Sequence, residues 1–133
     1  STETGWSRGM TNTPFSHEQL VHEVRKLADE RPNFIYSPPE GDSSCQYWHD
    51  DTDTPGCIFG HALANLGVDV SSIKQSTAID VTLVEILGDD YNKIPHYVSN
   101  WFMKVQEYQD EDYTWRYAVD TSDMVLKERG IRL

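Results

Sequence analysis

The stretch FSHEQLVHEVRKLADERP, residues 15–32, carries the start, the face and the end of an amphipathic helix. Ser16 and Gln19 have the Ser-x-x-Gln spacing of a capping box. Phe15 precedes the cap and can pack onto Leu20 as a hydrophobic staple. Pro32 ends the helix, because the residue before a proline avoids α geometry. Apolar residues recur at helical spacing and predict one buried face: Leu20, Val21, Val24, Leu27 and Ala28.

Two further helices are expected in the middle of the chain. The first begins near Cys57 and ends at Gly67, since glycine commonly follows the last helical residue. The second covers about residues 78–87, with Thr77 as its cap and Gly88 as its stop. The apolar face of the first comprises Ile58, Ala62, Leu63 and Leu66.

The C-terminal third predicts two more helices. Pro95 suits the first turn of one of them, because its ring presets a helical φ angle. Asp112 can cap the other, which continues to Gly130. Their inward-facing residues are Val98, Trp101, Phe102 and Val105 in the first, and Trp115, Ala118 and Val119 in the second.

Residues 33–56 have a different character. Residues 34–36 and 45–49 are short strand candidates, and the segments between and after them are rich in turn-forming Pro, Gly and Asp. This region is interpreted either as a small β-hairpin or as an irregular loop held by its aromatic residues. The chain is therefore predicted to be mainly α, with about five helices, in a single globular domain over residues 10–133. Residues 1–9 read as a leader or a cloning remnant before a natural start at Met10.

The charge balance excludes several function classes. The 133 residues include 11 basic and 22 acidic ones, which gives a net charge of −11. A direct nucleic-acid binder needs a positive footprint, and so does a protein held on anionic lipid. No apolar run approaches the roughly 20 residues of a membrane span, and no secretory signal precedes the domain. We therefore expect a cytoplasmic protein that binds neither nucleic acid nor membrane.

Two cysteines and two histidines form the pattern Cys45-x3-His49-x7-Cys57-x3-His61. Thiolate and imidazole are the ligands of tetrahedral zinc, and Cys57 and His61 share a face of the expected helix. If residues 45–49 are a strand, however, Cys45 and His49 lie about 13 Å apart and cannot reach one metal. The alternative is a buried Cys57, a surface His49 and no metal. A zinc module is thus a secondary hypothesis, and no other cofactor is expected.

Cys57 also suggests a cysteine-dependent enzyme. It follows Gly56 at the start of a helix, where the helix dipole lowers the pKa of a thiol. His61, His96 and His22 are candidate bases, but the sequence selects none of them and shows no oxyanion-stabilising motif. Small cysteines also open helices for packing reasons alone. A Cys45–Cys57 disulfide is disfavoured in an intracellular protein.

Acidic and aromatic residues gather in two segments and suggest a binding surface. The carboxylates could imitate the charge of nucleic acid and dock onto a basic protein, or could simply keep the protein in solution. Aromatic residues beside them are the side chains that anchor protein interfaces. The candidate surface comprises Tyr47, Trp48, Asp50, Asp51 and Asp53 with Asp110, Glu111, Asp112 and Tyr113.

Two segments follow a shared pattern. Residues 56–67, GCIFGHALANLG, match Gly-Cys-Ile-x-Gly-x-Ala-Leu-x-x-Leu-Gly, and residues 109–119 match Gln-Asp-x4-Trp-x-x-Ala-Val. In this order the pair resembles small proteins of actinobacteria and their phages. The resemblance implies a phage or actinobacterial origin, the cytoplasm of a bacterial host and an accessory role, and it implies no activity. We therefore expect a non-enzymatic, phage-encoded protein that binds a partner such as a basic host protein.

Overall fold

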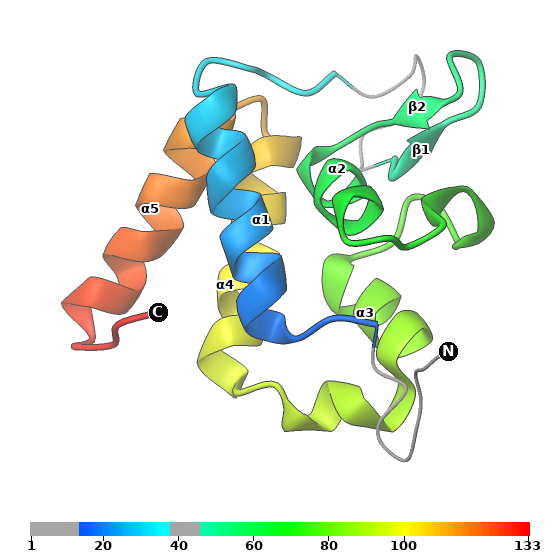
Figure 1. Ribbon diagram of the computed structural model, residues 1–133. Helices are drawn as coiled ribbons and strands as arrows, with labels where there is room; N and C mark the ends of the chain where they lie inside the picture. The colour runs from blue at the N-terminus through cyan, green and yellow to red at the C-terminus, as the bar shows by residue number, and fades with distance from the viewer. Residues whose placement is uncertain (1–13, 38–45) are drawn as a thin grey trace.

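The computed structural model describes residues 14–37 and 46–133. Within these ranges the chain forms five α-helices, two short 3-10 helices and one antiparallel hairpin (Figure 1). The prediction of a mainly α fold with a small β element is confirmed. None of the helices in these ranges is long and apolar enough to cross a membrane. The leader expected at residues 1–9 lies outside the described residues.

The helices surround one core. Helix α1 runs between α5 on one side and α2 on the other, α4 packs along α5, and α3 packs against α4 (Figure 1). The α-helices are α1 (His17–Glu30), α2 (Ile58–Asn65), α3 (Ile79–Leu87), α4 (His96–Asp110) and α5 (Trp115–Glu128). The remaining elements are β1 (Trp48–His49), β2 (Thr54–Pro55), η1 (Val70–Ser72) and η2 (Gly88–Lys93).

Helix α1 begins with the capping box that its sequence predicts. The Ser16 hydroxyl accepts the N–H of Gln19 at 3.1 Å, and the Gln19 side chain accepts the N–H of Ser16 at 2.7 Å. All five residues of the predicted apolar face are buried. Arg31 caps the other end, and its backbone N–H donates to the Leu27 carbonyl at 2.8 Å. Both ends of α1 are therefore fixed by local sequence.

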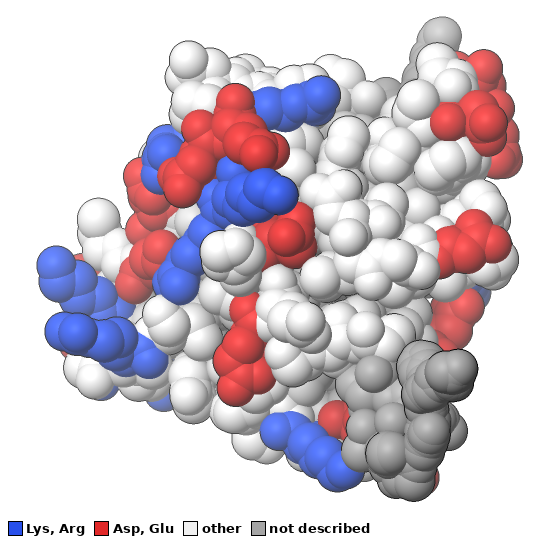
Figure 2. Space-filling model, in the orientation of Figure 1, with Lys and Arg blue, Asp and Glu red and all other residues white. Residues whose placement is uncertain are grey.

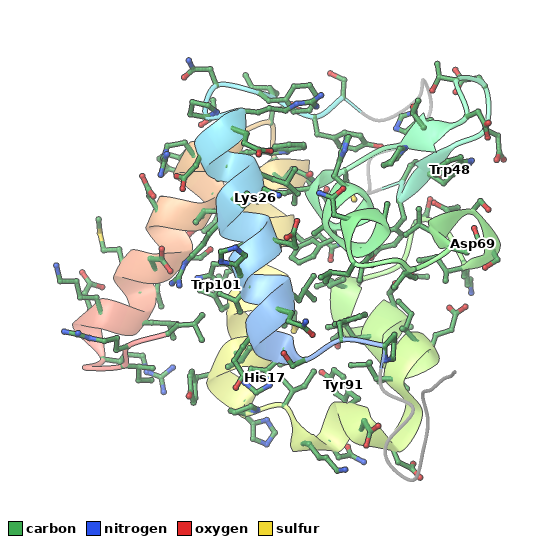
Figure 3. All side chains as sticks on the ribbon, viewed as in Figure 1. His17, Lys26, Trp48, Asp69, Tyr91 and Trp101 are labelled. Atoms are coloured by element: carbon green, nitrogen blue, oxygen red, sulfur yellow. The ribbon has the colours of Figure 1, made fainter. Side chains whose placement is uncertain are left out.

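The bulkiest side chains of the core are aromatic rings. Phe59 of α2 and Phe102 of α4 meet edge to face, with centroids 5.9 Å apart. Trp101 lies beside α1 (Figure 3), where the Arg25 guanidinium lies 5.4 Å from its ring centroid. The Trp101 indole donates to the Asp123 carboxylate at 2.9 Å. The largest fully buried side chains are Trp101, Trp115, Tyr47, Phe59 and Phe102.

The hairpin pairs different segments from those that the strand candidates suggest. Strand β1 pairs with β2, so that Trp48 faces Pro55 across a turn at residues 50–53. Asp53 in this turn has a φ of 55°, a left-handed conformation that Asp tolerates better than most residues. The other strand candidate, residues 34–36, is not a hairpin partner of residues 46–49. Ile35 instead forms an isolated bridge with Thr114, at the start of α5.

Two helices receive their N-terminal caps from α4. The cap positions of α2 and α3 are Cys57 and Ala78, and neither side chain caps its helix. Gln109 accepts the N–H of Ile58, and Gln106 accepts the N–H of Ile79, both at 2.7 Å. The expectation that Thr77 caps α3 is therefore wrong. A buried amide from a neighbouring helix satisfies the backbone donor instead.

The N-terminal cap of helix α5 lies two residues later than expected. Thr114, rather than Asp112, is the cap, and its hydroxyl accepts the N–H of Tyr117 at 3.0 Å. Asp112 has a φ of 70° and forms the turn between α4 and α5. Predicted Trp115, Ala118 and Val119 are buried, as expected. The left-handed turn at Asp112 thus reverses the chain before α5 starts.

Candidate functional site

Tyr47 belongs to the core and not to the binding surface on which it was expected. Its side chain is fully buried. The hydroxyl donates to the Thr77 carbonyl at 2.6 Å and accepts from Thr82 and from the Gln106 amide, each at 3.1 Å. Burial raises the pKa of Tyr47, although the three hydrogen bonds work in the opposite direction. This tyrosine therefore holds the start of α3 in place and cannot contact a partner.

The other hairpin residues of the expected surface are accessible. Asp50, Asp51 and Asp53 are exposed, and Figure 2 shows a group of acidic side chains over the hairpin. On the same face, Lys and Arg side chains lie mostly over α1 and α5. Trp48 is half-buried, and its backbone N–H donates to the Gln75 side chain at 2.8 Å (Figure 3). The hairpin thus presents charge without a fully exposed aromatic ring.

The second half of the expected surface, at the turn between α4 and α5, combines carboxylates with exposed rings. Tyr113 and Tyr117 stack with centroids 4.4 Å apart and planes 17° apart. Tyr108 lies edge-on to both, at 5.8 Å from Tyr113 and 5.9 Å from Tyr117. We call Tyr108, Tyr113 and Tyr117 the tyrosine cluster. Its two outer rings are 41% and 45% exposed, so the cluster presents a wide aromatic face to solvent.

Two of the carboxylates beside the tyrosine cluster, those of Glu111 and Asp112, have no cationic partner among the described residues. Glu111 and Asp112 are exposed, and neither forms an ion pair within residues 14–37 and 46–133. Asp110 is half-buried and accepts from the Gln109 amide at 2.9 Å. The nearby basic residues are already paired: Lys104 with Glu107, and Arg116 with Asp29 and Asp120. The site therefore favours a cationic group.

The described residues among the predicted zinc ligands do not gather at one point: the two histidines line a cavity, and Cys57 lies in the core. His49 and His61 line the same cavity, between residues 31–37 and the hairpin. Cys57 is fully buried and disulfide-bonded, and the sequence has one other cysteine, Cys45, which lies outside the described residues. A disulfide was disfavoured from the sequence, and for Cys57 that expectation is wrong. In this oxidised state Cys57 offers no thiolate to a metal or to a substrate.

No group of three or more potential metal ligands occurs in the part of the chain that the structure describes. His61 is a half-buried residue of α2, and the centroid of its ring lies 5.6 Å from that of the Trp115 ring. Burial lowers the pKa of His61, and the nearby charges of Arg31 and His49 lower it further. The two histidines thus share one cavity, described below as the histidine pocket.

Sequence reasoning missed two members of the tyrosine cluster. From the sequence, no role was assigned to Tyr108 or to Tyr117. The signal that could have found Tyr117 is its spacing from Tyr113, four residues apart at a helix start, where side chains meet. Comparison of the chain with protein-family models, with curated proteins and with solved structures found no match.

Proposed function

We propose that this chain is a small accessory protein that acts by binding, and that it captures a basic segment of a partner protein at the tyrosine cluster. The observation that carries the proposal is the exposed stack of Tyr113 on Tyr117 beside the unpaired carboxylates of Glu111 and Asp112. The phage origin that the resemblance implies, and a basic host protein as the partner that the acidic surface suggests, belong to the same proposal.

The chemistry of the surface selects for a cation. Each tyrosine face attracts an Arg or Lys head group by about 0.5–1 kcal/mol at an exposed site. Carboxylates beside the rings add Coulomb attraction, and Arg can stack on a ring while it donates hydrogen bonds to a carboxylate. The tyrosines are rigid side chains with few rotatable bonds, so little entropy is lost when they are covered. An arginine-rich segment is therefore the best-matched ligand.

The hairpin supports the proposal in a smaller way. Because Tyr47 lies in the core, the exposed carboxylates of the hairpin, Asp50, Asp51 and Asp53, have no exposed ring beside them. Their charge attracts a basic partner at long range, which speeds association and makes it sensitive to salt. We therefore assign the anchor to the turn between α4 and α5, and long-range attraction to the hairpin.

This assignment is tested by binding of a fluorescent arginine-rich peptide, followed by anisotropy at about 0.1 M salt, where charges more than about 10 Å away are screened. The variant E111Q/D112N is expected to weaken binding several-fold. The matched variant D50N/D51N removes the same number of charges from the hairpin and is expected to change affinity much less. Equal effects of the two variants would contradict an anchor at the turn.

A second variant separates the rings from the charge. Tyr113→Leu combined with Tyr117→Leu keeps the net charge and an apolar surface but removes the aromatic faces. Loss of one cation–π contact of about 0.5–1 kcal/mol corresponds to a roughly 2- to 5-fold weaker complex. A peptide with Glu in place of Arg should not bind to any of these proteins. Unchanged affinity of the leucine variant for the arginine peptide would exclude the tyrosine cluster as the anchor.

A further inference from the structure

We propose a second binding site, independent of the tyrosine cluster: the histidine pocket takes a small molecule that carries an oxyanion, either a carboxylate or a phosphate. The cavity has a volume of about 560 Å³ and lies between residues 31–37, the hairpin and α2. Its lining includes Arg31, Phe34, Tyr36, His49, Thr54 and His61. This is enough room for a small metabolite.

The charge of the pocket is opposite to that of the chain. The whole sequence carries −11, yet the described residues that line this cavity include Arg31 and two histidines and no carboxylate. Arg31 forms no ion pair with any residue in the described ranges. The Arg31 guanidinium, which no carboxylate of the described residues neutralises, makes the local potential positive, and the two imidazoles add ring nitrogens that can form hydrogen bonds. Such a cavity attracts an anion.

Arg31 is positioned before any ligand arrives. Its backbone is fixed at the C-terminal cap of α1. Its guanidinium lies 5.3 Å from the Phe34 ring centroid and 5.9 Å from that of Trp115. Stacking on rings engages the face of the guanidinium and leaves its in-plane N–H donors for an oxyanion, which the fork geometry matches. The ordering cost of this long side chain is thus reduced before binding.

His49 is also held in a fixed orientation. Its Nε2 atom lies 3.0 Å from the Tyr36 hydroxyl, and the two rings meet edge to face. Gly56 makes this possible, because a Cβ atom there would lie 2.4 Å from Cδ2 of His49 and 2.1 Å from the Gln46 carbonyl oxygen. Nδ1 of His49 makes no hydrogen bond with the described residues. It is the ring atom left for a ligand.

The apolar residues at the mouth of the pocket favour a ligand that carries an apolar or planar group in addition to its oxyanion. Phe34 and Ile35 are 37% and 48% exposed, and both line the cavity with Pro55. An apolar or planar group that covers these side chains gains about 25 cal/mol per Å² of buried apolar surface. In this arrangement the oxyanion contacts Arg31 and the histidines, and the apolar group of the ligand covers the apolar wall formed by Phe34, Ile35 and Pro55.

The test follows the imidazole signals of the full chain by NMR at constant ionic strength, with inorganic phosphate, acetate, phenyl phosphate and benzoate as probes. The five histidines are His17, His22, His49, His61 and His96. A saturable shift of the His49 and His61 signals, with the other three unmoved, is the expected result. The comparison of phosphate with acetate identifies the head group. Tighter binding of the phenyl compounds, by several-fold, is expected from the apolar wall.

Variants make the test decisive. Arg31→Gln is expected to weaken probe binding at least 10-fold, and His61→Gln to weaken it several-fold, while Arg129→Gln, an exposed arginine of the α5 cap, leaves it unchanged. Circular dichroism establishes that each variant is folded. The proposal is overturned if none of the probes moves the His49 and His61 signals selectively, or if Arg31→Gln binds them as the wild type does. Phenyl compounds that bind no tighter than the bare anions would remove the apolar wall from the site.

Discussion

The side-chain oxygen of Gln109 accepts the backbone N–H of Ile58 at 2.7 Å, across 51 positions of sequence. The same oxygen accepts the indole N–H of Trp115 at 3.2 Å. All three residues belong to the two segments that the sequence analysis singled out, residues 56–67 and 109–119. One buried amide therefore joins α2, α4 and α5, and the two segments are parts of one packing unit.

Removing this amide is expected to cost a large part of the stability. Gln109→Met keeps the volume but leaves the buried donors of Ile58 and Trp115 without an acceptor, at about 1–3 kcal/mol for each unsatisfied group. We expect the free energy of unfolding in urea to fall by about 2–4 kcal/mol. Asn100→Ala removes an exposed amide from the same helix and should change stability by less than about 0.5 kcal/mol. A similar small loss for both variants would show that the Gln109 contacts contribute little.

Gly60 allows α2 to lie directly against the backbone of Tyr47. A Cβ atom at this position would lie 2.2 Å from the Tyr47 carbonyl oxygen, a backbone atom that cannot rotate away. Gly60→Ala is therefore expected to lower the free energy of unfolding by about 1–3 kcal/mol or more, even though alanine favours helices. The loss is measured as a lower midpoint of unfolding in urea. Asn65→Ala, at an exposed position of the same helix, is the control and should be nearly neutral. A stabilised Gly60→Ala protein would mean that α2 can move away from residue 47.

Tyr47 links the hairpin region to α3 and α4 through its hydroxyl. Tyr47→Phe keeps the ring but withdraws the partner of the Thr77 carbonyl and of the Gln106 amide. The expected loss in the free energy of unfolding is about 1–3 kcal/mol, because these groups remain buried. Tyr91→Phe, which removes a half-buried hydroxyl bonded to Ser99, is the comparison and should cost less. Equal losses would indicate that the Tyr47 hydroxyl is replaced by water.

The helices were predictable because their signals are local. The capping box at Ser16 and the apolar face of α1 lie within one stretch of sequence and need no distant partner. The glutamine caps of α2 and α3 were not predictable, since Gln109 and Gln106 lie 51 and 27 positions from the donors that they satisfy. The pairing of Ile35 with Thr114 depends in the same way on how α1 meets α5.

The binding surface was half predictable. Successive residues of an extended segment point to opposite sides, so Tyr47 and Trp48 could not both face solvent in a strand. Alternation alone does not say which of them is buried, and the hydroxyl partners on α3 and α4 decide it. The histidine pocket escaped prediction because Arg31, His49 and His61 come from three separate segments. Only the fold brings their charges together.

The lowered pKa of His61 makes the stability of the protein depend on pH in a defined direction. Burial, with help from Arg31 and His49, disfavours the charged imidazole in the folded state. As the pH falls below about 6.5, the ordinary value for histidine, the unfolded chain takes up a proton that the folded chain resists. Stability is therefore lost as the pH falls from about 6.5 to the depressed pKa of the folded state. Above about pH 7.5 this loss is absent, because the imidazole is neutral in both states.

Chemical unfolding at a series of pH values between about 5 and 8 isolates this effect by comparison of variants. His61→Gln cannot take up the proton, so its stability should fall less than that of the wild type as the solution becomes acidic. His22→Gln removes an exposed imidazole from α1 and leaves His61 in place, so it is expected to keep the full wild-type decrease. If His61→Gln loses as much stability as the wild type over this range, the imidazole of His61 is protonated in the folded chain without penalty, because water or a neighbouring group then solvates its charge.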